Sequence, residues 1–165
     1  MAKGYNNWEQ FYHRFNTIFH GIIALSLLPF AFVFLETQRD YPDGPLVEAE
    51  WILPMEILLG LISLGAAFYA WRFQKNLQSA VSNDLTIKER LGGYLKLKLR
   101  QYAILEVASL SALIGLFLTK EQFFSGVYVV VLFVFSIGRP TYDLVVRELR
   151  FSKEEEAKLK SGEFE

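Results

Sequence analysis

The sequence predicts an all-α integral membrane protein with four transmembrane helices, arranged as two hairpins with both termini in the cytoplasm. Three observations support this prediction: four long apolar blocks, basic residues gathered on one side of those blocks, and tryptophans at the edges of the second block. Apolar residues make up 52% of the 165-residue chain. A soluble domain of this size rarely concentrates its apolar residues in four long blocks.

The four apolar blocks have the length of membrane spans. They cover residues 17–35, 52–71, 102–118 and 123–141. A helix rises about 1.5 Å per residue, so each block can cross roughly 30 Å of hydrocarbon, although the third is slightly short. Trp51 and Trp71 bracket the second block, and tryptophan favours the membrane–water interface. We therefore assign residues 1–150 to a four-helix transmembrane domain and 151–165 to a charged cytoplasmic tail.

Basic residues determine the predicted orientation. Of the 17 lysines and arginines, 15 lie before the first block, between the second and third, or from the end of the fourth onward. The other two connections hold only Arg39 and Lys120. Positively charged loops stay in the cytoplasm, so both termini and the middle loop are expected there. The location is expected to be the inner (plasma) membrane of a bacterium.

Local patterns predict how some helices begin. Thr86-x-x-Glu89 is a capping box, so a short inner helix is expected to start there and to weaken at Gly92-Gly93, before the third span. An aromatic stripe precedes the first span, with members at positions i, i+3, i+4 and i+7: Trp8, Phe11, Tyr12 and Phe15. The stripe predicts either an amphipathic helix in the membrane interface or a plain extension of the first span.

The last block and the tail have features of their own. Pro140 removes an amide donor near the inner end of the fourth span, so a kink is expected there. In the tail, Glu156 and Lys160 are spaced i, i+4, which is typical of a solvated helix end.

Small residues form a stripe on each of two spans. These residues are Gly60, Ser63 and Ala67 on the second span, and Ala108, Ser111, Ala112 and Gly115 on the third. Small side chains let membrane helices approach closely, so both stripes are expected to be helix contact faces. The contacts lie either within one chain or between chains of a homo-oligomer.

Polar side chains inside the spans are the candidate functional residues, because charge at that depth is costly. The candidates are Glu56, Glu106, His20, Arg139, Asp143, Tyr142 and Asn16. His20 and Glu106 lie roughly 5–6 Å into their spans from the cytoplasmic edge. We expect a cluster there, in which Arg139 pairs with Glu106 or with Asp143. In the structural alternative, Arg139 reaches the headgroups and His20 bonds to a backbone carbonyl. Glu56 is isolated in the outer half, where only Lys120 is close enough to reach it.

The sequence excludes several kinds of chemistry. Without cysteine there is no disulfide, thiolate metal site, iron–sulfur cluster or cysteine nucleophile. His13 and His20 lie roughly 10 Å apart along a helix, too far to bind one haem iron together. Phosphate-binding and catalytic motifs are absent, and a net charge of −1 gives no reason to expect nucleic acid as a partner. We expect no cofactor, no metal site and no catalytic residue.

Three functions fit these patterns. The first is an oligomeric protein, embedded in the lipid bilayer, that provides an intramembrane polar pathway for an ion, a proton or a small solute. Four helices are few to enclose a pore, so a homo-oligomer or a larger membrane complex is needed. The second is a non-enzymatic accessory or scaffold subunit that docks a larger membrane complex. The third is a lipid-modifying enzyme of the inner leaflet, which predicts a cavity open sideways to lipid.

Overall fold

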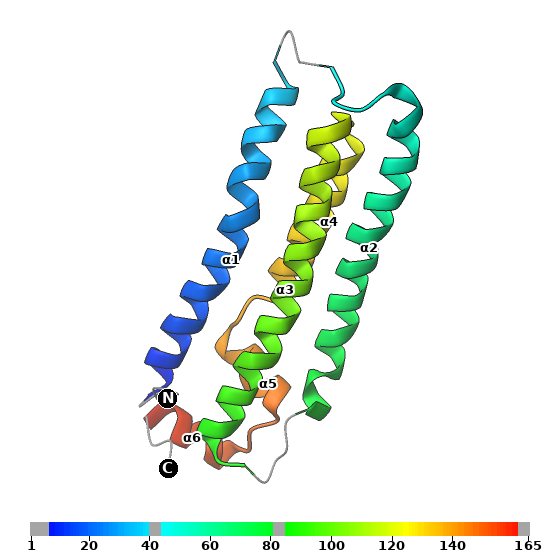
Figure 1. The fold of residues 1–165 in the computed structure, drawn as a ribbon. Helices are drawn as coiled ribbons and strands as arrows, with labels where there is room; N and C mark the ends of the chain where they lie inside the picture. The colour runs from blue at the N-terminus through cyan, green and yellow to red at the C-terminus, as the bar shows by residue number, and fades with distance from the viewer. Residues whose placement is uncertain (1–6, 40–43, 81–84, 162–165) are drawn as a thin grey trace.

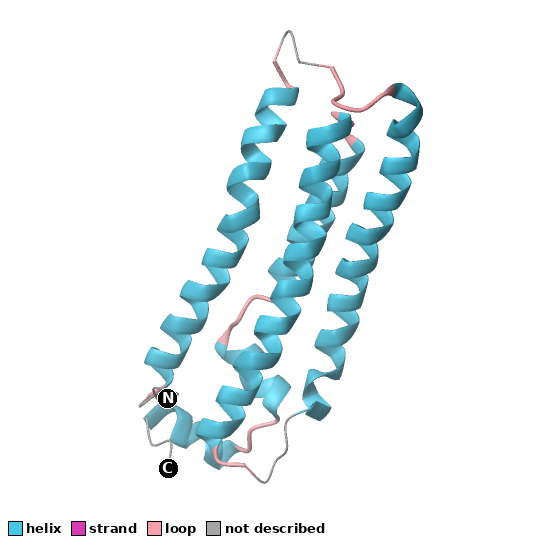
Figure 2. Cartoon of the chain, viewed as in Figure 1, coloured by secondary structure: helices cyan, strands magenta, loops and turns pink. Residues whose placement is uncertain are grey.

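The computed structural model describes residues 7–39, 44–80 and 85–161. This part of the chain is entirely helical, with no strand (Figure 2). The helices are α1 (Trp8–Thr37), α2 (Ala49–Ala80), α3 (Ile87–Thr119), α4 (Phe123–Ile137), α5 (Tyr142–Leu149) and α6 (Lys153–Ser161).

The four long helices lie side by side, and α3 is at the centre of the bundle (Figure 1). It packs against α1, α2 and α4. Helix α1 begins and α6 ends at the same end of the bundle, where α5 also lies (Figure 1). We call this the terminal end, and the end where α3 passes into α4 the opposite end.

The helices have the length and composition of membrane spans. Helix α1, residues 49–74 of α2, and α3 are each long and apolar enough to cross a membrane. Helices α4 and α5 together make a fourth candidate, bent by 73°. Large apolar side chains on the outside of the bundle, such as Leu28, Leu61 and Val129, are more than 60% exposed. The prediction of an all-helical protein with membrane-spanning helices is confirmed at this level, with three or four candidate spans.

The small-residue stripes pack inside one chain. The hydroxyl of Ser63 on α2 donates a hydrogen bond to the carbonyl of Ala108 on α3, at 2.7 Å. Ser63, Ala67, Ala108 and Ala112 are all buried. Gly60 and Gly115 face α4, and Ser111 bonds back to Val107 in its own helix. These residues therefore make helix contacts within the chain.

The third span is longer than the sequence predicts. The capping box at Thr86 and Glu89 is present, but the helix that starts there continues without a break to Thr119. The predicted weakening at Gly92-Gly93 is wrong. The residues that flank the two glycines, Leu91, Tyr94 and Leu95, are buried. Tertiary packing of this segment therefore overrides the low helix propensity of glycine.

The aromatic stripe near the N-terminus belongs to the first span. Asn7 caps α1, which runs as one helix to Thr37. Phe11 and Phe15 are fully buried, and the Phe15 ring lies 5.9 Å from that of Tyr94 on α3, edge to face. The stripe is therefore part of one continuous helix with the first apolar block. Aromatic side chains at that spacing suit a protein neighbour as well as a membrane surface.

The fourth span is broken rather than kinked. Helix α4 ends at Ile137, short of the predicted end at residue 141, and a new helix begins after Thr141. Pro140 lacks an amide hydrogen and disfavours helical geometry at Arg139, which ends the helix. The Thr141 hydroxyl then accepts a hydrogen bond from the Leu144 amide at 3.3 Å and starts α5.

The described part of the tail forms α6, which contacts the bundle through a few side chains while most of its residues are exposed. Leu159 of α6 is fully buried, and Glu155 forms an ion pair with Arg90 of α3 at 2.7 Å. The predicted pair of Glu156 and Lys160 is present, at 3.1 Å.

Candidate functional site

A carboxyl group in the middle of α3 meets hydroxyl groups from two other helices. Ser26 on α1 donates a hydrogen bond to Oε2 of Glu106, at 3.2 Å. The phenol of Tyr128 on α4 donates in turn to the Ser26 oxygen, at 3.3 Å. Ser26 and Tyr128 are buried, and the Tyr128 ring stacks on Phe30, with 3.7 Å between ring centroids. Three helices thus build one short chain of hydrogen bonds that ends on Glu106.

The other oxygen of this carboxyl group has no partner. Oε1 of Glu106 is buried and makes no hydrogen bond within the described residues. No ion pair reaches the group from that part of the chain either. A carboxylate without a cation at the depth of a membrane span is costly, whereas a neutral carboxylic acid is not.

The predicted cluster around Glu106 does not form. His20 is exposed, and its Nδ1 lies 2.8 Å from the carbonyl oxygen of Asn16, as in the structural alternative. Arg139 and Asp143 are exposed, and within the described residues neither pairs with Glu106. The prediction assumed a fourth helix continuous to residue 141. Because α4 ends at Ile137 and the chain bends, Arg139 and Asp143 leave the line of the span.

The remaining predicted residues are dispersed. Tyr142 on α5 lies at the terminal end, where its hydroxyl is 3.3 Å from Glu156 and its ring meets Trp8 edge to face. Glu56 is half-buried on α2 and makes no hydrogen bond or ion pair within the described residues. Lys120 does not reach it, and its ammonium lies over the ring of Phe117 instead, 5.0 Å from the centroid.

A buried polar network at the terminal end was not predicted. Glu148 on α5 is its centre. Its Oε2 is 3.2 Å from the ammonium of Lys98 and accepts a 2.6 Å hydrogen bond from the phenol of Tyr94. Gln74 on α2 donates to its other oxygen, at 3.3 Å. The network joins α2, α3 and α5 around one carboxylate.

The network continues along α3 in both directions. Towards the opposite end, Gln101 donates to Gln74 at 3.1 Å, and the hydroxyl of Tyr102 donates to the carbonyl of Gly138 at 2.9 Å. Towards the terminal end, Arg90 pairs with Glu155, donates to the carbonyl of Leu149, and lies over the ring of Phe151. Because α4 ends at Ile137, the carbonyl of Gly138 has no partner within a helix, and the hydroxyl of Tyr102 supplies one.

A repeat in the sequence could have revealed this network. Arg90, Tyr94, Lys98, Tyr102 and Glu106 recur at every fourth position of α3. Residues four apart lie on the same side of a helix, with a slow rotation along it. Sequence reasoning counted the basic members of this series as loop charges that set orientation. A polar side chain at every turn of a long helix is instead a sign of a polar contact face.

No protein-family model, curated protein or solved structure significantly matches this chain. Its function must therefore be argued from its own geometry.

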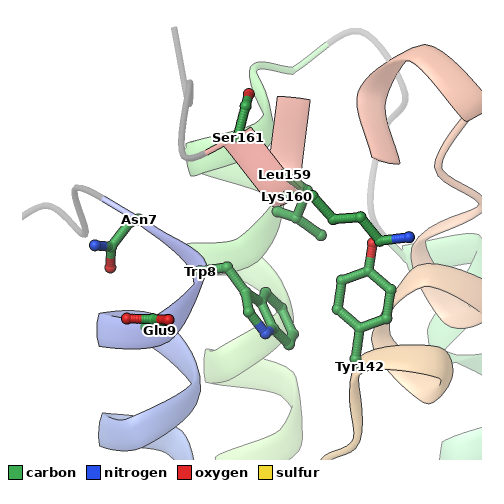
Figure 3. Close-up of a pocket in the computed structure, with 7 residues that line it drawn as sticks. All are labelled: Asn7, Trp8, Glu9, Tyr142, Leu159, Lys160 and Ser161. Atoms are coloured by element: carbon green, nitrogen blue, oxygen red, sulfur yellow. The ribbon is translucent and has the colours of Figure 1, made fainter. Parts of the chain in front are cut away.

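A pocket of about 440 Å³ lies at the terminal end (Figure 3). It is lined by Asn7, Trp8, Glu9, Tyr142, Leu159, Lys160 and Ser161. The side chains of Trp8 and Tyr142 point toward one another, and the ammonium of Lys160 lies over the Tyr142 ring (Figure 3). The carboxylate of Glu156 accepts a hydrogen bond from Lys160 and raises the pKa of Lys160. Because Glu156 also neutralises this lysine, the pocket offers no free cation from its lining to an anionic ligand.

Proposed function

We propose that the protein provides an intramembrane polar pathway for protons, and that Glu106 binds and releases them. The observation that carries the proposal is the carboxyl group of Glu106, with one oxygen bonded to Ser26 and the other buried without a partner. A group held in this way can gain or lose a proton without breaking an ion pair. A purely structural carboxyl would be expected to have its charge matched by a cation.

In this proposal the chain crosses the membrane four times as two hairpins, with α4 and α5 as the last crossing. The terminal end lies in the cytoplasm, because 15 of the 17 basic residues belong to segments at that side of the spans. Glu106 is then reached from the cytoplasm. The proposed location is the inner membrane of a bacterium.

The polar series on α3 supports a route from the terminal end. Arg90, Tyr94 and Lys98 lead inward, and Tyr102 lies one turn before Glu106. Beyond Glu106 the opposite end is filled by packed apolar and aromatic side chains: Phe30, Ala112, Leu116, Phe124, Val127 and Tyr128. A route through one chain therefore stops at Glu106 in this conformation. Passage to the other side requires a rearrangement of these side chains or a second chain.

The exposure of Glu106 favours a second chain. Glu106 is partly exposed at the outside of a bundle whose neighbouring surface is apolar. A homo-oligomer that covers this position would enclose the carboxyl group away from lipid. Four helices alone leave no such enclosure. We therefore include homo-oligomerisation in the proposal.

The other two functions are less well supported. A scaffold subunit explains the exposed apolar surface, but lipid explains it equally well. A lipid-modifying enzyme predicts a cavity open sideways, and one exists between α2 and α4, but its lining is apolar throughout. Such a lining fits the binding of a lipid and supplies no acid, base or nucleophile.

The test is proton flux in liposomes that contain the purified protein and a pH-sensitive dye. An imposed pH gradient should decay faster with the wild-type protein than in empty liposomes, and Glu106→Gln should abolish the difference. Glu56→Gln, which alters another half-buried carboxyl in a span, is the matched control and should retain flux. Infrared difference spectra should show a protonated carboxyl band that is missing only in Glu106→Gln. Equal flux in wild type and Glu106→Gln would refute the proposal.

A further inference from the structure

A groove between α2 and α4 opens on the outside of the bundle. Its volume is about 520 Å³. It is lined by Leu64, Ala67, Phe68, Trp71, Val130, Phe133, Val134 and Ile137. Phe68 and Phe133 are both more than half exposed, so the groove is accessible from the surrounding membrane. All its lining residues lie in the candidate spans, where the molecules available to fill it are hydrocarbon chains or another helix.

Two arginines follow the lining residues of the groove in the sequence, Arg72 directly after Trp71 on α2 and Arg139 two residues after Ile137. On α2, Leu64, Phe68 and Arg72 are four residues apart, so Arg72 continues the lining face one turn beyond Phe68. On the other side, Ile137 is the last residue of α4, and Arg139 follows in the break. Both helices run toward the terminal end here (Figure 1). Arg72 and Arg139 therefore both follow the lining residues in that direction.

Neither arginine is neutralised by the described part of the chain. Arg72 and Arg139 are exposed, and within that part no carboxylate forms an ion pair with either. Arg90, Lys98 and Lys160 differ in this respect, since each has a carboxylate partner. Two guanidinium groups without an ion pair in the described residues, next to an apolar groove, are complementary to an anionic headgroup.

We propose that the groove holds an acyl chain of an anionic phospholipid, with the headgroup phosphate between Arg72 and Arg139. The apolar lining suits the hydrocarbon chain, and guanidinium groups bind phosphate oxygens through paired hydrogen bonds. Anionic lipids are attracted to basic residues at the membrane surface. A second copy of this chain is a poorer occupant, because in the same orientation it brings its own arginines to the same level.

This inference is independent of the proton pathway. Glu106, Ser26 and Tyr128 do not line the groove, and the groove residues take no part in the hydrogen bonds of Glu106. Failure of either proposal leaves the other standing.

The first experiment tests the headgroup. The purified full-length protein is titrated with phosphatidylglycerol or phosphatidylcholine, and bound lipid is counted by native mass spectrometry. Wild type should bind phosphatidylglycerol more tightly. Arg72→Gln and Arg139→Gln should each weaken that binding roughly fivefold and weaken phosphatidylcholine binding less, because the choline ammonium offsets the charge of the phosphate that the two lipids share. Arg100→Gln, which removes an exposed arginine of α3 that is not at the groove, should bind phosphatidylglycerol like the wild type.

The second experiment tests the groove itself. Val130 lines the groove and Val129 does not, and both side chains are at least 48% exposed, so a tryptophan at either position leaves the core intact. Val130→Trp should fill the groove and reduce the binding of both lipids, whereas Val129→Trp should not. Three results would overturn the proposal: unchanged lipid binding in Val130→Trp, equal losses in both tryptophan variants, or no headgroup preference in the wild type. Dissociation of a dimer by Val130→Trp, with lipid binding intact, would instead assign the groove to a second copy.

Discussion

Lys98 of α3 and Glu148 of α5 form an ion pair that is almost completely removed from solvent. The ammonium and Oε2 are 3.2 Å apart, and the two side chains are 0% and 5% exposed. Tyr94 and Gln74 donate further hydrogen bonds to the same carboxylate. Helix α5 is separated from α4 by a short non-helical segment, and this ion pair connects α5 to the central helix α3. The pair therefore holds α5 against α3.

Removal of one partner should destabilise the protein strongly. Lys98→Met leaves the carboxylate of Glu148 buried without a cation, and the soluble-protein benchmark for this is a loss of about 3–5 kcal/mol. The double variant Lys98→Met/Glu148→Gln should recover part of that loss. Lys96→Met is the control, because Lys96 is exposed two residues away. Thermal unfolding in detergent measures all four proteins. A loss equal to that of the control would mean that the pair does not hold α5.

Close packing of α3 against α4 gives a second prediction. A Cβ atom at Gly115 would overlap the ring of Phe124, whereas one at Gly126 of α4 would meet nothing within 4 Å. Gly115→Ala should therefore cost about 1–3 kcal/mol through overpacking. Gly126→Ala should be neutral or stabilising by up to about 1 kcal/mol, since alanine favours a helix. The melting temperatures of the two variants should move in opposite directions, or only that of Gly115→Ala should move. Equal shifts would contradict the tight contact.

The helices were largely predictable, because they depend on features that are local in the sequence. Long apolar blocks correspond to α1, α2, α3 and α4, and the capping box at Thr86 marks the start of α3 correctly. Small residues such as Ser63 and Ala108 predicted the faces that pack. The residues at which the helices begin and end were less predictable. Packing carries α3 across Gly92-Gly93, whereas Pro140 ends α4 outright instead of bending it.

The polar contacts were not predictable in the same way. Glu148 lies 50 residues from Lys98 in the sequence and meets it only because the chain turns back after Ile137. The expected partner of Glu106 was Arg139, chosen by counting residues along helices assumed to be straight. A break in one helix invalidates such a count. The four-residue repeat on α3 was visible in the sequence, but nothing there identifies which segment covers it.

A double-mutant cycle should show no coupling between Glu106 and Arg139. The two residues do not interact in the structure, so their effects on unfolding should add within about 0.5 kcal/mol. A cycle between Glu106→Gln and Tyr128→Phe should instead give a coupling of about 0.5 kcal/mol or more, because Ser26 links the two groups. Tyr128→Phe keeps the ring stacked on Phe30 and removes only the hydroxyl. A large coupling with Arg139 would restore the cluster expected from the sequence.

The orientation in the membrane can be tested with single cysteines, since the chain has none of its own. Glu48 precedes α2 at the opposite end, and Ser152 lies between α5 and α6 at the terminal end; both are exposed. In intact cells a membrane-impermeant maleimide should label Glu48→Cys and should reach Ser152→Cys only after the membrane is opened. The expectation rests on the basic residues, which retain a segment in the cytoplasm. Labelling of both cysteines from outside would mean that the chain crosses the membrane an even number of times between them. Helix α4, with its 73° bend to α5, would then be the first candidate span to discard. The reverse pattern, with Ser152→Cys labelled first, would invert the orientation and place the approach to Glu106 on the outer face.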